Sequence, residues 1–144
     1  MDIVAASPEM LEQIVRIEDE SFSDPWSPES LRGAMEDSLC RFTAAAEGGE
    51  VLGYCIMHCL YEQAELYSIA VSPEYRRQGT AKLLLEDALA WARAAGAGSV
   101  LLEVRRSNAP ARALYEALGF EQISVRKKYY TAPTEDAVIM QKML

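Results

Sequence analysis

The chain has 144 residues, of which 50% are hydrophobic and 25% are charged, and its 22 acidic residues outnumber its 14 lysines and arginines to give a net charge of −8. This length and composition suit one soluble globular domain spanning residues 1–144 and exclude a disordered or collagen-like chain. A strongly negative chain repels a phosphate backbone, so we expect no nucleic acid among its partners.

The sequence also does not indicate a membrane-spanning segment or a metal site. The longest apolar run, residues 51–60, is well short of the ~20 residues that cross a membrane, and the N-terminus has no signal-peptide pattern. The three cysteines, Cys40, Cys55 and Cys59, are an odd number that suits free thiols in a reducing compartment. On a strand, Cys55 and Cys59 share one face and His58 points to the other, which disfavours a metal site. We expect a cytoplasmic monomer.

The first half of the chain predicts one strand, two helices and an antiparallel meander. A strand at Ile3-Val4 precedes a helix that begins at Ser7-Pro8-Glu9 and ends near Glu20. A break at residues 25–29 starts a second short helix that carries Leu31 and Met35 on one face. Three consecutive strands follow, at Arg41–Glu47, Val51–Leu60 and Leu66–Val71.

The second half predicts two helices and three strands. The helices are expected over Thr80–Ala95 and Asn108–Leu118, and the strands over Ser99–Val104, Phe120–Tyr129 and Ala137–Leu144. A meander combined with a strand–helix–strand crossover requires a mixed sheet, so the fold class is α/β with helices on both faces. In such sheets ligands bind where the winding changes direction, which points to the loop Ser72–Gly79.

That loop ends in Arg76-Arg77-Gln78-Gly79-Thr80-Ala81 at the start of the longest predicted helix. A helix start offers unpaired backbone N–H groups, and small residues there let a phosphate approach them. The letters match neither the P-loop pattern nor GxGxxG. A glycine turn with two solvated arginines is the alternative interpretation of the same segment.

Two groups of residues carry a family resemblance. Ile69-Ala70-Val71 followed by Arg76 to Leu84 resembles the acetyl-CoA motif of the GNAT family of N-acetyltransferases, Q/R-x-x-G-x-G/A. The second half resembles the RimI-type branch of that family, the ribosomal-protein alanine N-acetyltransferases. The segments concerned are Leu102 to Arg105, Ser107 to Ala111, Leu114 to Glu116, Leu118 to Phe120, and Arg126 with Tyr129-Tyr130. Lys128 departs from the pattern, since glycine is expected before the tyrosine pair.

The resemblance implies the GNAT fold, a mostly antiparallel twisted sheet, and acetyl-CoA as co-substrate. It implies direct acetyl transfer to the N-terminal alanine of a small-subunit ribosomal protein, with Glu103 as the catalytic base and Tyr115 as the proton donor to the thiolate. The implied acetyl-CoA contacts are the backbone of Ile69, Ala70 and Val71 for the pantetheine arm, the backbone amides of Arg77, Gln78, Gly79, Thr80, Ala81 and Lys82 for the pyrophosphate, and Asn108.

Each of these residues also has a structural interpretation. Partial burial near the end of an apolar strand would make Glu103 a better base than a solvated carboxylate, but it is equally placed to pair with Arg105 or Arg126. Tyr115 fits a core tyrosine of an amphipathic helix as well as a cleft hydroxyl. Asn108, before Ala109-Pro110, is a good helix N-cap.

The acceptor side is less well defined by sequence. The acidic run Glu18-Asp19-Glu20 with Asp24 could attract a basic polypeptide or simply be a solvated helix end. Pro25-Trp26 and Tyr129-Tyr130 could line a peptide cleft, and Trp26 could equally staple the second helix. The remaining alternatives are an enzyme that acetylates a small amine or lysine, and a non-catalytic acyl-CoA-binding module.

Overall fold

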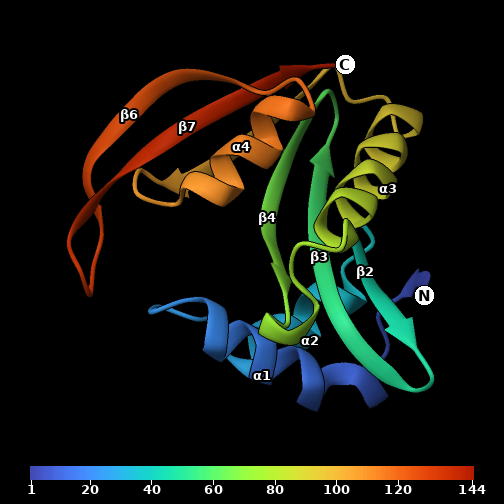
Figure 1. Cartoon of the computed structure of the whole chain (residues 1–144). Helices are drawn as coiled ribbons and strands as arrows, with labels where there is room; N and C mark the ends of the chain where they lie inside the picture. Colours follow the sequence, from blue (N-terminus) through green and yellow to red (C-terminus); the bar gives the residue numbers. More distant parts are fainter.

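The order of elements along the chain is the predicted one. A computed structural model describes all residues, 1–144, and shows a seven-stranded sheet (Figure 1). The strands are β1 Asp2–Ala5, β2 Cys40–Glu47, β3 Glu50–Leu60, β4 Gln63–Val71, β5 Ser99–Arg105, β6 Glu121–Tyr130 and β7 Glu135–Met143. The helices are α1 Leu11–Ser21, α2 Pro28–Glu36, α3 Thr80–Ala94 and α4 Ala109–Ala117, with short 3-10 turns at Pro8–Met10 and Pro73–Tyr75.

The sheet has the order β1-β2-β3-β4-β5-β7-β6. Only β4 and β5 run parallel, because α3 carries the chain back between them, and every other neighbouring pair is antiparallel. The expected mixed, mostly antiparallel sheet is therefore confirmed. The position of β7 between β5 and β6 was not foreseen, because hydrophobic patterns mark strands without saying which of two final strands pairs with β5.

Two apolar clusters cover the two faces of the sheet, so helices lie on both faces as predicted. One contains Leu84, Leu85 and Ala88 of α3 with Tyr115 of α4, and the other contains Ile14 and Ile17 of α1 with Leu31 of α2. No helix in the fold has the length and apolar character needed to span a bilayer.

Strand β3 is buried on both sides, and its residues alternate between the clusters. Cys55, Met57 and Cys59 lie in the α3 cluster, whereas Tyr54 and Ile56 lie in the α1 cluster. All three cysteines of the chain are free thiols, as expected. His58, on the face opposite to the two β3 cysteines, stacks on Tyr67 with 5.0 Å between ring centroids.

Some boundaries differ from the predicted ones. Strand β4 begins at Gln63, three residues earlier than expected, because polar Gln63 and Glu65 pair with β3 on one side and β5 on the other. The first helix starts as a 3-10 turn, and Ser7 donates its hydroxyl to Glu9 instead of capping a backbone amide.

Candidate active site

The main irregularity of the sheet is the separation of its only parallel pair. Gln63, Ala64 and Glu65 pair with Ser99, Val100 and Leu101, and the pairing stops there. Both strands continue, to Val71 and Arg105, so the β5-facing edge of residues 66–71 carries backbone groups without a strand partner. A β-bulge at Tyr67 marks the start of the separation, because the pairs with β3 skip that residue. In Figure 1 the β6–β7 hairpin, which continues the sheet from β5, stands away from β4.

The segment after β4 also carries unpaired backbone amides. Arg77 and Gly79 have left-handed backbones, with φ of 64° and 81°, and turn the chain into α3. The backbone N–H groups of residues 76–82 donate to no protein acceptor, and no side chain caps α3. A helix start of this kind favours an anion.

The alternative interpretation of this loop agrees in part with the structure. Arg76 and Arg77 are both exposed, as solvated arginines are, but the Arg76 Nε also donates to the Val71 carbonyl at 2.9 Å and its Nη2 lies 3.5 Å from the Ser21 hydroxyl. The guanidinium therefore braces the loop against the end of β4. Thr80 is buried, and its hydroxyl lies 3.7 Å from the Met1 sulfur.

Glu103 lies on the opposite face of β5 from the apolar residues. Val100, Leu102 and Val104 are buried in the α3 cluster, so alternation turns Glu103 toward the face that α1 and α2 cover. Its side chain is 33% exposed, and its Oε1 lies 3.5 Å from Nη1 of Arg126. The ion pair with Arg126, one of the two considered, is thus present, and the carboxylate is less buried than expected.

A tyrosine adjoins this ion pair. Hydrogen bonding to the Glu103 carboxylate, together with its charge, raises the pKa of Tyr129. The Arg126 guanidinium lies 5.4 Å from the centroid of the same ring. Glu103, Arg126 and Tyr129 therefore form one polar group.

Tyr115 combines a core ring with a free hydroxyl. The ring packs edge-on against Phe120 at 5.9 Å, inside the cluster that α3 forms with the sheet. The hydroxyl makes no hydrogen bond to the protein, yet it is not among the buried polar atoms sealed from solvent. Burial raises the pKa of Tyr115, so the phenol keeps its proton at neutral pH.

Two further predicted positions have clear backbone roles. Asn108 caps α4, since its Oδ1 accepts a hydrogen bond from the Ala111 amide at 3.2 Å, and its side-chain nitrogen donates to no protein group. Lys128 has a φ of 53°, a left-handed conformation that favours glycine. Its amide donates to Asp136 at 2.9 Å, so this chain keeps the unusual backbone with a lysine.

The acidic run on α1 is not a uniformly solvated helix end. Glu18 is 1% exposed, and its carboxylate accepts hydrogen bonds from the Tyr54 and Ser68 hydroxyls and from the Trp26 amide. Its neighbours Asp19 and Glu20 are exposed, as expected for a solvated helix end. The Glu18 carboxylate ties α1, the segment after it and β4 together.

Comparison with known proteins identifies the family of this chain. The Acetyltransferase (GNAT) family matches residues 9–120 of the chain. The chain belongs to this family. The family and the acetyltransferase class expected from the motifs are therefore confirmed, and GNAT acetyltransferases use acetyl-CoA.

Two relatives and one solved structure align with most of this chain. The ribosomal protein bS18-alanine N-acetyltransferase of Escherichia coli (strain K12) is 36% identical over 126 residues, 86% of this chain and 84% of that protein. The enzyme of the same name from Haemophilus ducreyi is 37% identical over 134 residues, 89% of this chain and 90% of that protein. The crystal structure of the ribosomal-protein-S18-alanine N-acetyltransferase from Escherichia coli matches with a TM-score of 0.89 at 33% identity, covering 99% of this chain and 92% of that one.

Three residues near the acetyltransferase site escaped the sequence analysis in part or in full. Glu18 follows Ile14 by four residues, which places it on the apolar face of α1, and that spacing could have revealed its burial. Tyr67 is the bulged residue of β4, and no pattern in the letters marks it. Arg105 was considered only as a partner of Glu103, whereas its guanidinium contacts other segments.

Proposed function

We propose that the chain transfers the acetyl group of acetyl-CoA to the α-amino group of a ribosomal protein that begins with alanine. The observation that carries the proposal is the free edge of β4 together with the unpaired amides of residues 76–82, which follow it after the 3-10 turn Pro73–Tyr75. The names of the relatives support the acceptor. In this proposal residues 1–144 act as one domain, because both halves of the sheet contribute to the site. The proposal also takes this domain to be a monomer in the cytoplasm.

Acetyl-CoA contacts both of these sets of backbone groups. Its pantetheine arm pairs with the edge of β4 at Ile69, Ala70 and Val71, as an added strand pairs with a sheet. Its pyrophosphate accepts hydrogen bonds from the amides of residues 77–82 at the start of α3. Asn108, whose side-chain nitrogen has no protein partner, contributes a further contact.

The two catalytic residues divide the proton transfers. Glu103, directly or through a water molecule, accepts the proton that the amine loses, and the amine nitrogen forms a bond to the thioester carbonyl carbon. When the tetrahedral intermediate collapses, the carbon–sulfur bond breaks and the thiolate takes the phenolic proton of Tyr115. Tyr115 then recovers a proton from solvent, which completes the balance.

An α-amine is the easier acceptor for this site. Its pKa is about 8 and that of a lysine is about 10.4, so deprotonating a lysine near pH 7 costs roughly 3 kcal/mol more.

Mass spectrometry of acetyl transfer tests the proposal. We expect acetylation of a short peptide that begins with alanine. We expect none of the same peptide with a blocked N-terminus and an internal lysine. Transfer to the lysine would show a different acceptor class, and binding of acetyl-CoA without any transfer would point to a small-amine enzyme or a binding module.

A further inference from the structure

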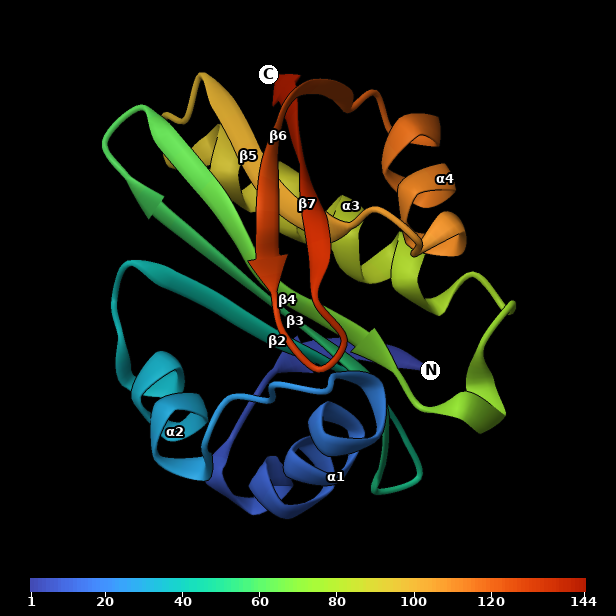
Figure 2. The same cartoon turned by 90° about the vertical axis from the view of Figure 1, so that its left-hand side faces the viewer.

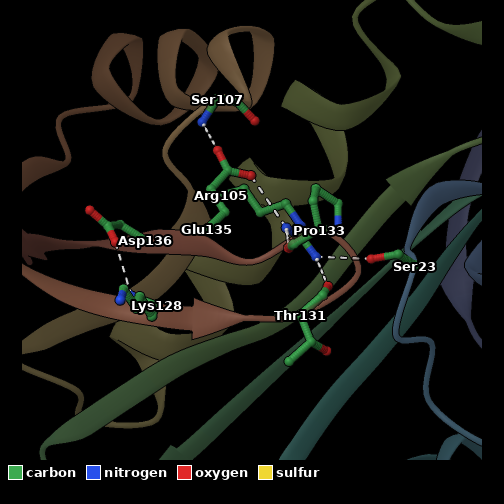
Figure 3. A network of polar contacts seen from close by, with 8 residues as sticks. All are labelled: Ser23, Arg105, Ser107, Lys128, Thr131, Pro133, Glu135 and Asp136. Carbon is green, nitrogen blue, oxygen red and sulfur yellow. Dashed lines mark hydrogen bonds and ion pairs between the residues drawn. The ribbon is translucent and has the colours of Figure 1, made fainter.

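Arg105 makes an unusually complete set of contacts for a partly exposed arginine. It is the last residue of β5 and lies two residues after Glu103, so both side chains point to the same face of the strand. Its side chain is 22% exposed. The guanidinium donates to four acceptors, which are the Pro133 carbonyl at 2.9 Å, Glu135 Oε1 at 3.3 Å, the Thr131 carbonyl at 2.8 Å and the Ser23 hydroxyl at 2.9 Å (Figure 3).

These acceptors belong to segments that are far apart in the sequence. Ser23 lies in the segment that joins α1 to α2, residues 22–27, and Thr131 and Pro133 lie in the β6–β7 turn, residues 131–134. Figure 2 shows this turn next to the α1–α2 segment. The Tyr130 ring, just before the turn, lies 4.6 Å from the guanidinium carbon.

We propose that Arg105 is a positioning residue that fixes the α1–α2 segment to the β6–β7 turn and so sets the entrance for the acceptor peptide beside Glu103. The inference rests on the proposed function: Trp26 lies in the first segment, the Tyr129-Tyr130 pair at the end of β6 directly precedes the second, and these aromatic residues are the ones proposed to flank the acceptor side.

The chemistry of the site requires arginine. Four acceptors, three in residues 131–135 and one at Ser23, match the planar fork of a guanidinium, which donates in fixed directions and stacks on an aromatic ring. A lysine ammonium is a compact point charge with three donors, so it cannot serve all four acceptors and the ring together. Glu135 is itself held in place, because its Oε2 accepts the Ser107 amide at 2.6 Å.

Steady-state kinetics with two variants and a matched control test the role. We expect Arg105→Gln and Arg105→Lys each to raise the KM for an alanine-starting peptide by at least about tenfold, while the KM for acetyl-CoA changes less than about twofold. The control is Arg106→Gln, since Arg106 is 59% exposed and makes only an ion pair to Asp136 at 3.7 Å with its side chain. It should leave both KM values unchanged. Full rescue by lysine, or equal rises in both KM values, would overturn the proposal.

Hydrogen exchange provides a readout that does not depend on activity. We expect Arg105→Gln to increase amide exchange in residues 22–27 and in residues 131–134 together, with β3 unchanged. If the wild-type protein acetylates no peptide, the proposed function fails, and the exchange result still decides whether Arg105 couples the two segments. Unchanged exchange in either segment would overturn the coupling.

Discussion

Glu103 and Tyr115 come from opposite faces of the sheet. Glu103 faces the side that α1 and α2 cover, and Tyr115 lies in the cluster on the α3 side. In a continuous sheet the backbone would separate two such side chains. We propose that the thioester lies where β4 and β5 stop pairing, after Glu65 and Leu101, so that a base and an acid act on it from opposite sides. This is the physical reason for assigning one proton transfer to each residue.

Replacing Tyr115 with phenylalanine removes the proposed acid with little other change. Because the hydroxyl has no protein partner, the substitution leaves no buried group unpaired. We expect Tyr115→Phe to lower kcat by about 10²-fold or more, as is typical for loss of a general acid, with acetyl-CoA affinity unchanged. Turnover can be followed by thiol release and affinity by calorimetry. An unaltered kcat would remove Tyr115 from the chemistry.

Replacing Glu103 with glutamine tests the proposed base. The amide keeps the shape of the carboxylate but cannot take a proton from the amine, so we expect kcat to fall by about 10²-fold or more at pH 7. Glu121→Gln serves as the control, because Glu121 is exposed on β6. If the Glu103→Gln enzyme kept its activity, the ion pair with Arg126 would be the only role left for Glu103.

At the scale of elements, the start of α3 depends on Gly79. Its φ of 81° is strained for any residue with a Cβ, and no atom lies within 4 Å of the position a Cβ would take. We therefore expect Gly79→Ala to cost about 1–2 kcal/mol of stability and to weaken acetyl-CoA binding by about tenfold or more, because the methyl group obstructs the amides. Urea unfolding and calorimetry measure the two effects.

Gly33→Ala is the matched control for this substitution. Gly33 lies inside α2 with no positive φ and open space around its Cβ position, so alanine there should stabilise the protein by about 0.5–1 kcal/mol and leave acetyl-CoA binding unchanged. Equal acetyl-CoA affinity for the Gly79→Ala variant and the wild type would argue against a pyrophosphate at the start of α3.

At the scale of the whole molecule, buried tyrosines make stability depend on alkaline pH. Burial raises the pKa of both Tyr54 and Tyr115. Below the unfolded-state pKa of about 10 both states keep the phenolic proton, and above it only the unfolded state loses the proton. These two tyrosines should therefore make the free energy of unfolding decrease above about pH 10, each contributing about 1.4 kcal/mol per pH unit.

Urea unfolding from pH 8 to 11.5 measures this dependence. Tyr115→Phe should reduce the slope above pH 10 by about 1.4 kcal/mol per pH unit, whereas Tyr61→Phe, at an 86% exposed position, should not change it. Equal slopes for the wild type and Tyr115→Phe would mean that the Tyr115 phenol ionises as freely in the folded protein as in the unfolded one.

Local patterns and long-range contacts differ in how well they could be predicted. Alternation along β3 and helical spacing in α3 depend on neighbouring residues. The helices and strands, the mixed sheet and the strand face of each cysteine could therefore be predicted from the sequence. The separation of β4 and β5, the place of β7 and the contacts of Arg105 depend on residues tens of positions apart. The burial of Glu18 lies between these cases, since its spacing from Ile14 is local but its three donors come from distant segments.

Binding of a conjugate that joins both substrates tests the central claim most directly. The conjugate has the sulfur of CoA linked through an acetyl group to the α-nitrogen of an alanine-starting peptide. If acetyl-CoA and the peptide N-terminus meet between β4 and β5, calorimetry should show a Kd at least about 100-fold below that of CoA alone, since linked ligands gain from effective concentration. The same peptide linked through a lysine Nζ should show a much smaller gain. Equal Kd values for CoA and the α-linked conjugate would contradict the account.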